Sequence, residues 1–116
     1  MITIEALTVP LQGKLLVADT IGRPVQAVVA SDLMSDVLVV TREDFLLVTS
    51  LASDQMIRTA DLVGAAGVVL VNGKKPPASA LKLAGDLGIA LIVTPLPKYE
   101  ACLALGSALA GRESTP

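Results

Sequence analysis

Residues 67–95 read GVVLVNGKKPPASALKLAGDLGIALIVTP, and this stretch decides the fold. Its two ends, residues 68–72 and 89–94, are continuous apolar runs rich in β-branched side chains. Continuous rather than alternating apolar runs are typical of strands that are covered on both faces, as in a parallel sheet. Between the runs, Pro76 and Pro77 suit the first turn of a helix and Gly88 suits its end. The stretch therefore predicts a strand, a helix and a second, parallel strand joined by a right-handed crossover.

The same pattern continues on both sides of this unit. Residues 45–50 form a third apolar run, and Ser53 is placed to cap a helix that extends to about Ala65. A further helix is expected from near Pro97 to about Ala110. Strands and helices that alternate in this way indicate an α/β protein.

The first third of the chain is less regular. Its expected elements are a helix at residues 3–9 that Pro10 ends, strands at 14–18 and 24–30, and a helix at 32–38 capped by Asp32. Taken together, the segments predict an α/β fold with three α/β/α layers around a mixed, mostly parallel sheet.

The length of 116 residues and the mass of 11.9 kDa suit one domain. We expect this domain to span residues 1–111, with residues 112–116 as a frayed tail. The chain contains no histidine, which excludes hydrolases with a His-containing triad and most zinc sites. The only cysteine, Cys102, lies in an apolar run and is expected to be a small buried hydrophobe rather than a nucleophile. No cofactor and no metal ion are expected.

The mean hydropathy is high, at +0.69, but no run of about 18 or more apolar residues occurs. The first five residues lack the basic start and apolar core of a signal peptide. The net charge of −2 offers no basic patch for nucleic acid. The sequence therefore predicts a cytoplasmic protein that binds neither membranes nor nucleic acid.

Small polar residues and two lysines follow the predicted strands. In parallel α/β sheets, ligands bind beyond the carboxyl ends of the strands, where loops and helix N-termini meet. The candidate ligand-binding residues at these ends are Ser31, Asp32, Ser50, Asn72, Gly73, Lys74, Lys75 and Thr94. They suit a small anion such as a phosphate or a carboxylate. The alternative is that they serve only as ordinary helix caps and turns.

Asp32 and Asp36 are four residues apart and would share one face of a helix. Such a pair suits a divalent cation or a basic partner surface; otherwise Asp32 is a cap and Asp36 is solvated. A metal-dependent enzyme of phosphoryl or acyl-phosphate chemistry, using Asp32, Asp36 and Lys74, is the less favoured hypothesis, because no nucleophile–base pair accompanies them.

The last predicted helix has no charged residue between Ala101 and Ala110. A helix that is apolar on nearly every side must be covered on nearly every side. One face is expected to lie on the sheet and another against a second copy of the chain; burial within the monomer is the alternative. The candidate interface residues are Tyr99, Cys102, Leu103, Gly106 and Ala110.

Three segments of the chain resemble the DRTGG domain family. They are VVASDLMSDVL (28–38), TADLVGAAGVVLVNGKKPP (59–77) and GIALIVTPLPKYEACLAL (88–105). The first resembles the family's Ser-Asp-Val-Leu block, the second its helix, strand and Gly-Lys-Pro turn, and the third its last strand and helix. The segments cover most of the chain in the family's order, although the pentapeptide DRTGG is itself absent.

This resemblance implies an α/β/α fold similar to the N-terminal domain of HPr kinase/phosphorylase, without the kinase domain. In that family such domains look like regulatory or oligomerising modules, and a redox-related or carbon-metabolism partner protein is implied. We therefore expect a non-catalytic regulatory module, homodimeric, that binds a small anionic or nucleotide ligand. A purely structural oligomerisation domain is the alternative.

Overall fold

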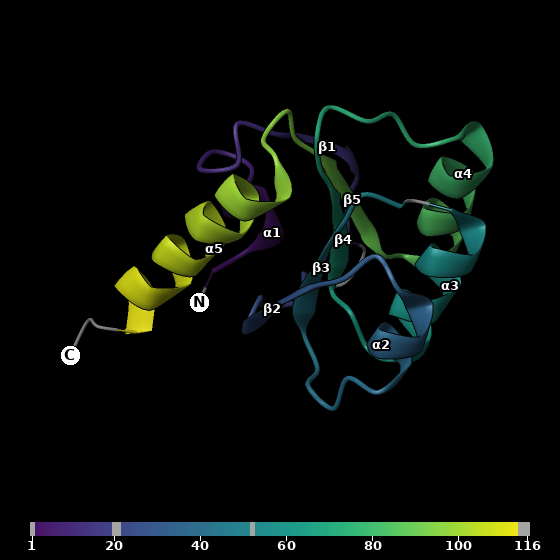
Figure 1. Cartoon of the computed structure of the whole chain (residues 1–116), viewed down its shortest axis with the longest axis horizontal. Helices are drawn as coiled ribbons and strands as arrows, with labels where there is room; N and C mark the ends of the chain where they lie inside the picture. Colours follow the sequence, from purple (N-terminus) through teal and green to yellow (C-terminus); the bar gives the residue numbers. More distant parts are fainter. Residues whose placement is uncertain (1, 20–21, 52, 114–116) are drawn as a thin grey trace.

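The computed structural model describes residues 2–19, 22–51 and 53–113, the last three of these by their backbone alone. In chain order (Figure 1), the elements are α1 (Ile4–Leu7), β1 (Lys14–Val17), β2 (Ala27–Ala30), α2 (Met34–Leu38), β3 (Phe45–Thr49), α3 (Asp54–Leu62), β4 (Gly67–Leu70), α4 (Ala78–Leu87), β5 (Ala90–Val93) and α5 (Lys98–Glu113).

The strands form one five-stranded sheet in the order β1-β5-β4-β3-β2. Strands β2 to β5 are parallel neighbours, and β1 is antiparallel to β5. The predicted mixed, mostly parallel sheet is therefore confirmed. Strands β1 and β2 are consecutive in the chain but occupy opposite edges of the sheet.

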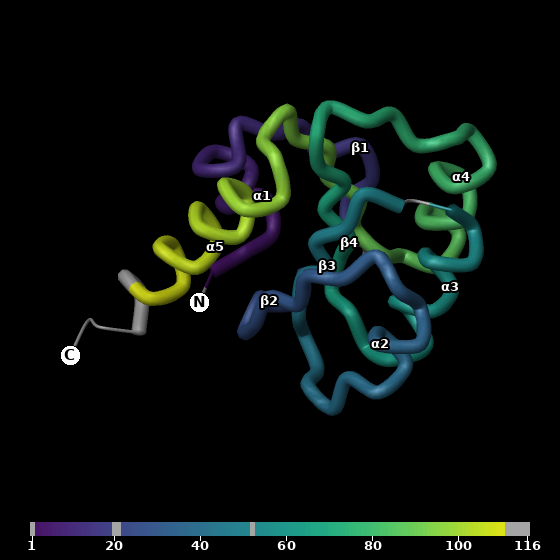
Figure 2. The backbone as a smooth tube through the Cα atoms, in the orientation of Figure 1, coloured from purple at the N-terminus to yellow at the C-terminus, as the bar shows by residue number. Residues whose placement is uncertain are grey.

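Helices cover both faces of the sheet, with α1 and α5 on one face and α2, α3 and α4 on the other (Figure 2). Alternate residues of β3 serve the two layers. Phe45 and Leu47 pack with α2, α3 and α4, whereas Leu46 and Val48 pack on the side of α1 and α5. All four side chains are fully buried. The predicted three-layer α/β/α architecture is thus confirmed.

Two of the predicted helix ends are confirmed by their local geometry. The Ser53 hydroxyl accepts a hydrogen bond from the Met56 N–H at 3.2 Å, so Ser53 caps α3. Gly88 ends α4 in the left-handed conformation, at a φ of 72°. Helix α3 ends at Leu62, earlier than predicted, and Gly64 follows it at a φ of 91°.

The prediction that Asp32 caps the second helix is wrong. Helix α2 begins at Met34 with Leu33 as its N-cap, and no side chain caps it. The cause is that the Asp32 carboxylate hydrogen-bonds to residues of the neighbouring strand end instead.

The tail predicted at residues 112–116 differs from the structure in part. Helix α5 continues through Glu113, so the first two tail residues have a helical backbone. Ser114, Thr115 and Pro116 lie outside the described residues. Within the part of the chain that the structure describes, no helix has the length and apolar character needed to cross a membrane. A cytoplasmic location stays a prediction.

Candidate functional site

The predicted ligand-binding residues all follow strands, but the structure separates them into two groups. Ser31, Asp32 and Ser50 follow β2 and β3, at one side of the sheet. The loop from Asn72 to Lys75 and the residue Thr94 follow β4 and β5, nearer the other side. The two groups differ in what their polar atoms contact.

The first group is built around the carboxylate of Asp32. Its Oδ1 accepts hydrogen bonds from the Thr49 hydroxyl at 2.9 Å and the Ser50 N–H at 2.7 Å. Its Oδ2 accepts from the Ser50 hydroxyl and from the Lys98 ammonium, both at 2.6 Å. We call Asp32, Thr49, Ser50 and Lys98 the Asp32 cluster. It joins the ends of β2 and β3 to the first residue of α5.

The surroundings of Asp32 favour its charged form. Partial burial opposes ionisation, but the hydrogen bonds from Lys98, Ser50 and Thr49 outweigh it and hold the pKa of Asp32 well below its usual range. The same hydrogen bonds mean that donors of the protein itself occupy both carboxylate oxygens. The cluster is suited to holding α5 against the sheet rather than to binding an anion.

The predicted cation pair is not formed on a helix face. Asp32 precedes α2, while Asp36 lies within it and is exposed. Among the residues that the structure describes, no group of three or more His, Cys, Asp or Glu side chains is placed to hold a metal ion.

Two further predicted residues use their hydroxyls locally. The Ser31 hydroxyl accepts a hydrogen bond from the Leu33 N–H at 3.1 Å. Thr94 is buried, and its hydroxyl donates to the Leu11 carbonyl and accepts from the Leu96 N–H. These contacts shape the loops after β2 and β5.

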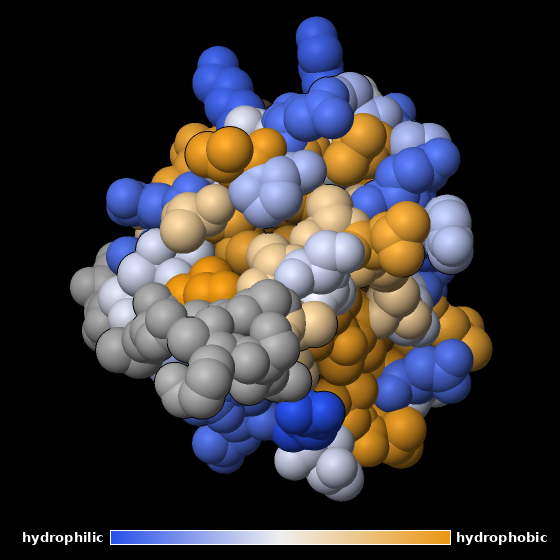
Figure 3. Space-filling view, turned by 90° about the vertical axis from the view of Figure 1, so that its left-hand side faces the viewer, coloured by the Kyte–Doolittle hydropathy of each residue, from blue (hydrophilic) through white to orange (hydrophobic). Residues whose placement is uncertain are grey.

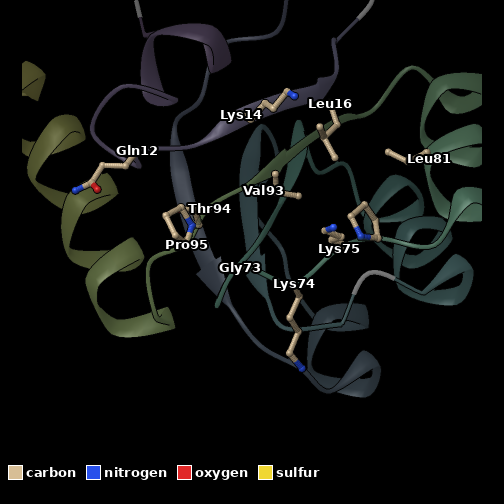
Figure 4. A pocket seen from close by; sticks show the side chains of 11 residues that line it. Gln12, Lys14, Leu16, Gly73, Lys74, Lys75, Leu81, Val93, Thr94 and Pro95 are labelled. Atoms are coloured by element: carbon tan, nitrogen blue, oxygen red, sulfur yellow. The ribbon is translucent and has the colours of Figure 1, made fainter.

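The second group borders a cavity of about 480 Å³, which we call the β4–β5 pocket (Figure 4). Such a volume is within the range of small-molecule sites. Three predicted residues after β4 and one after β5 line it, together with residues of the first loop, β1, β5 and α4. The lining residues are Gln12, Lys14, Leu16, Gly73, Lys74, Lys75, Pro76, Leu81, Val93, Thr94 and Pro95. Asn72, the remaining predicted residue of this group, does not line the pocket.

The pocket lies where two chain connections diverge. After β4 the chain passes to α4 on one face of the sheet, and after β5 it passes to α5 on the other face. In open α/β sheets this divergence leaves a crevice at the carboxyl ends of the strands. Asn72 and Gly73, both with φ near +65°, form the tight turn that opens the crevice, and the Gly73 N–H donates to the Thr94 carbonyl at 2.9 Å.

Strand β1 supplies the far wall of the pocket. Lys14 pairs with Val93 and Leu15 with Ile92, but the next pair is Val17 with Leu91, so Leu16 is the extra residue of a bulge. Bulges redirect side chains. Here Leu16 lines the pocket beside Val93 of the neighbouring strand (Figure 4).

The charged side chains of the pocket are all lysines. Lys14, Lys74 and Lys75 are exposed and border it, and none of the lining residues carries a carboxylate. This is a local excess of positive charge in a chain whose net charge is −2. Figure 4 shows Lys74 extending away from Val93 and Leu16, so Lys75 is the predicted lysine better placed for a ligand in the pocket.

Sequence reasoning missed Lys98, Lys14 and Leu16. Lys98 did carry a signal, because a cation at the first residue of a helix faces the positive end of the helix dipole and needs an anionic partner. Lys14 and Leu16 carried none, since a lysine and a leucine are ordinary residues of an edge strand.

Four of the five predicted interface residues form a stripe along the outer side of α5. Tyr99 and Leu103 are 72% and 54% exposed, and Gly106 and Ala110 are exposed as well. Their spacing of four, three and four residues places them on one helix face. Figure 3 looks at the side of the molecule that bears α1 and the C-terminal part of α5, and apolar side chains gather across its middle.

Cys102 differs from the stripe, because it is half-buried and packs against the core under α5. Burial raises the pKa of its thiol, and the nearby Lys98 charge opposes this only in part. A thiol with a raised pKa is less ionised at neutral pH, which lowers its reactivity. The predicted role as a small buried hydrophobe is met in part, because the side chain is half-buried rather than buried.

No family model matches the chain, and no curated protein does. Among solved structures, the chain is similar to the crystal structure of the CBS and DRTGG domains of the regulatory region of Clostridium perfringens pyrophosphatase, complexed with the activator diadenosine tetraphosphate. The TM-score is 0.72 at 13% sequence identity, and the match covers 89% of this chain and 45% of that chain. At this identity the likeness shows the fold alone, and it supports a DRTGG-related fold.

Proposed function

We propose that this chain is a non-catalytic regulatory module that binds a small anionic ligand in the β4–β5 pocket. The observation that carries the proposal is the pocket itself. It is a cavity of about 480 Å³ at the carboxyl ends of two parallel strands, bordered by three lysines and no carboxylate. A ligand with negative charge would be attracted there by Coulomb forces and would partly neutralise the lysines.

The comparison with known structures supports the regulatory part of the proposal. The similar structure belongs to a regulatory region and contains a nucleotide activator. Nucleotides are therefore among the anions to test first. A redox-related or carbon-metabolism protein that receives the signal stays an expectation from the family resemblance.

The catalytic alternative has less support from the geometry. It required Asp32, Asp36 and Lys74 to act together on a metal-bound phosphate. The Asp32 oxygens accept hydrogen bonds from four donors of the chain, and Lys74 borders a different site.

If the lysines attract the ligand, replacing one of them should lower the affinity for it. ADP, diadenosine tetraphosphate and acetyl phosphate would be screened by thermal shift, because a ligand that binds only the folded state raises the melting temperature. For a ligand that binds, Lys75→Ala should weaken the affinity about five- to tenfold in calorimetry, since one charge-assisted contact is lost. The matched control is Lys82→Ala, an exposed lysine of α4 that does not line the pocket. Equal affinities of the two variants would remove the pocket from the proposal.

We propose further that a second copy of the chain covers the outer stripe of α5. The specific observation is that Tyr99 and Leu103 are large and exposed, while Gly106 and Ala110 are small enough to let another helix approach closely. If no ligand binds to the pocket, this surface alone would support the alternative of a structural oligomerisation domain.

A charge introduced into the apolar stripe of α5 should produce a monomer. Leu103→Asp places a charge in the middle of the proposed contact, so we expect it to sediment at the 11.9 kDa mass of one chain. The unmodified chain should sediment at twice this mass. Leu62→Asp is the control, because Leu62 is a 77% exposed leucine on α3. A single-chain mass for the unmodified protein at tens of micromolar would contradict the dimer.

A further inference from the structure

The walls of the β4–β5 pocket are aliphatic. Leu16, Leu81, Val93, Pro76 and Pro95 line it. No aromatic side chain does, because the only phenylalanine, Phe45, is fully buried in the sheet and the only tyrosine, Tyr99, lies on α5. The pocket therefore lacks a flat surface on which a nucleobase could stack.

The polar side chains of the pocket are also unsuited to reading a base. The Thr94 hydroxyl is occupied by the Leu11 carbonyl and the Leu96 N–H. The Gln12 amide points away from Val93 in Figure 4. Lysines remain, and they carry donors without any acceptor. The amino group of an adenine would find no side-chain acceptor there, which costs free energy.

The arrangement of β1, β5 and α4 explains why the aliphatic side chains of Val93 and Leu16, the floor of the pocket, stay accessible. Helix α4 packs on this face, but β1 extends the sheet by one antiparallel strand beyond β5. Val93 and Leu16 are consequently half-buried, although their neighbours Leu91 and Ile92 are fully buried. A ligand that covered Val93 and Leu16 would remove apolar surface from water.

We infer that the ligand of the β4–β5 pocket is an aliphatic chain that ends in an anionic group, a carboxylate or a phosphate, and not a nucleotide. The inference rests on the proposed function and names the ligand class for the same site. The chain lies on Val93 and Leu16, and the anionic group lies between Lys14 and Lys75 at the rim. A dry cavity of about 150 Å³ holds a benzene molecule, so 480 Å³ has room for a chain of several carbons.

A homologous series of ligands tests this inference on the full chain. Acetate, butanoate, hexanoate and octanoate share one head group and differ only in apolar length. We expect the Kd to fall by about two- to fourfold for each added CH2. Octanol, without the charge, should bind more weakly than octanoate, and octyl phosphate compared with octanoate shows which anionic group the lysines prefer.

Two variants show whether the binding occurs in this pocket. Val93→Thr keeps the shape and the β-branching of the side chain but makes the floor polar, so it should weaken octanoate binding severalfold and reduce the gain per CH2. Val29→Thr is the same exchange on β2, outside the pocket, and should leave the affinity unchanged. Lys75→Ala should weaken all members of the series by a similar factor.

The possible failures are distinct. An affinity that does not change from acetate to octanoate would overturn the inference, as would an unaltered response in Val93→Thr. Binding of ADP that depends on Lys75, without binding of octanoate, would overturn the inference but leave the proposed function intact. Failure of octanoate, octyl phosphate, ADP, diadenosine tetraphosphate and acetyl phosphate alike would overturn both.

Discussion

Replacement of Arg23 by alanine should lower the free energy of unfolding by about 3 kcal/mol, the largest loss that we expect from a single polar residue. The Arg23 guanidinium holds three acceptors at the amino ends of the strands. Its Nε donates to Asp44 Oδ1 at 3.1 Å, and its two Nη atoms donate to the carbonyls of Ala65 at 3.0 Å and Gly64 at 2.8 Å. Arg23 thus ties the segment before β2 to the residues that precede β3 and β4.

The size of the effect follows from what the variant leaves behind. The Arg23 side chain is only 25% exposed, so water replaces its donors incompletely. A hydrogen bond to a charged group contributes about 1.5–3 kcal/mol, and acceptors left without a donor add to the loss. Lysine at this position would restore the charge but not the three-way geometry, because an ammonium is a point charge on a flexible stem. Arg23→Lys should therefore recover only part of the stability.

Urea denaturation monitored by circular dichroism measures this loss. Arg58→Ala is the matched control, since Arg58 is exposed on α3, and its effect should remain within about 0.5 kcal/mol. The melting temperature of Arg23→Ala should be about 10 °C lower than that of the unmodified chain. A loss for Arg23→Ala as small as that for Arg58→Ala would show that these hydrogen bonds contribute little.

The parallel part of the fold could be predicted because its signals are local. The apolar runs that become β3, β4 and β5, the Ser53 cap and the Gly88 stop each depend on a few neighbouring residues. The place of β1 could not be predicted in the same way. Its residues form a strand wherever a partner edge is free, and its pairing with β5 joins Lys14 to Val93, far along the chain. Such a pairing depends on the assembled sheet rather than on local propensity.

In the candidate sites, too, local signals could be read from the sequence and long-range contacts could not. Lys75 was predicted because loops after parallel strands meet at one edge of a sheet. Leu16 could not be predicted, because its place in the pocket depends on a bulge that no residue type in the sequence indicates. An aspartate before a helix is often its cap, so the sequence predicts that role for Asp32. Its actual partners Thr49, Ser50 and Lys98 are 17, 18 and 66 residues away. Local spacing carries no information about contacts of that range.

Replacement of Asp32 by asparagine should cost about 2 kcal/mol at neutral pH. The asparagine oxygen can keep the bonds from the Thr49 hydroxyl and the Ser50 N–H, so its NH2 group takes the place of Oδ2. The loss then comes from the Ser50 hydroxyl bond at this oxygen and from the negative charge, which strengthens every bond that the carboxylate accepts. The pair with Lys98 carries less, since both side chains are more than a third exposed and solvent screens them. Lys98→Ala should therefore be milder than Asp32→Asn.

The difference in stability between the unmodified chain and Asp32→Asn should depend on pH. The folded state lowers the pKa of Asp32 below the value of about 3.9 that it has in an unfolded chain. The unfolded state then binds more protons as the pH falls below about 4, so the stabilisation is fully present above this pH and is lost as the pH decreases toward the folded pKa. Urea titrations at pH 6, 4 and 2 should show nearly the same difference between the two proteins at pH 6 and pH 4 and a clearly smaller one at pH 2. Asp36→Asn, at an exposed position of α2, is the control for removing a carboxylate. A difference that stays constant from pH 6 to pH 2 would mean that Asp32 acts through packing and not through its charge.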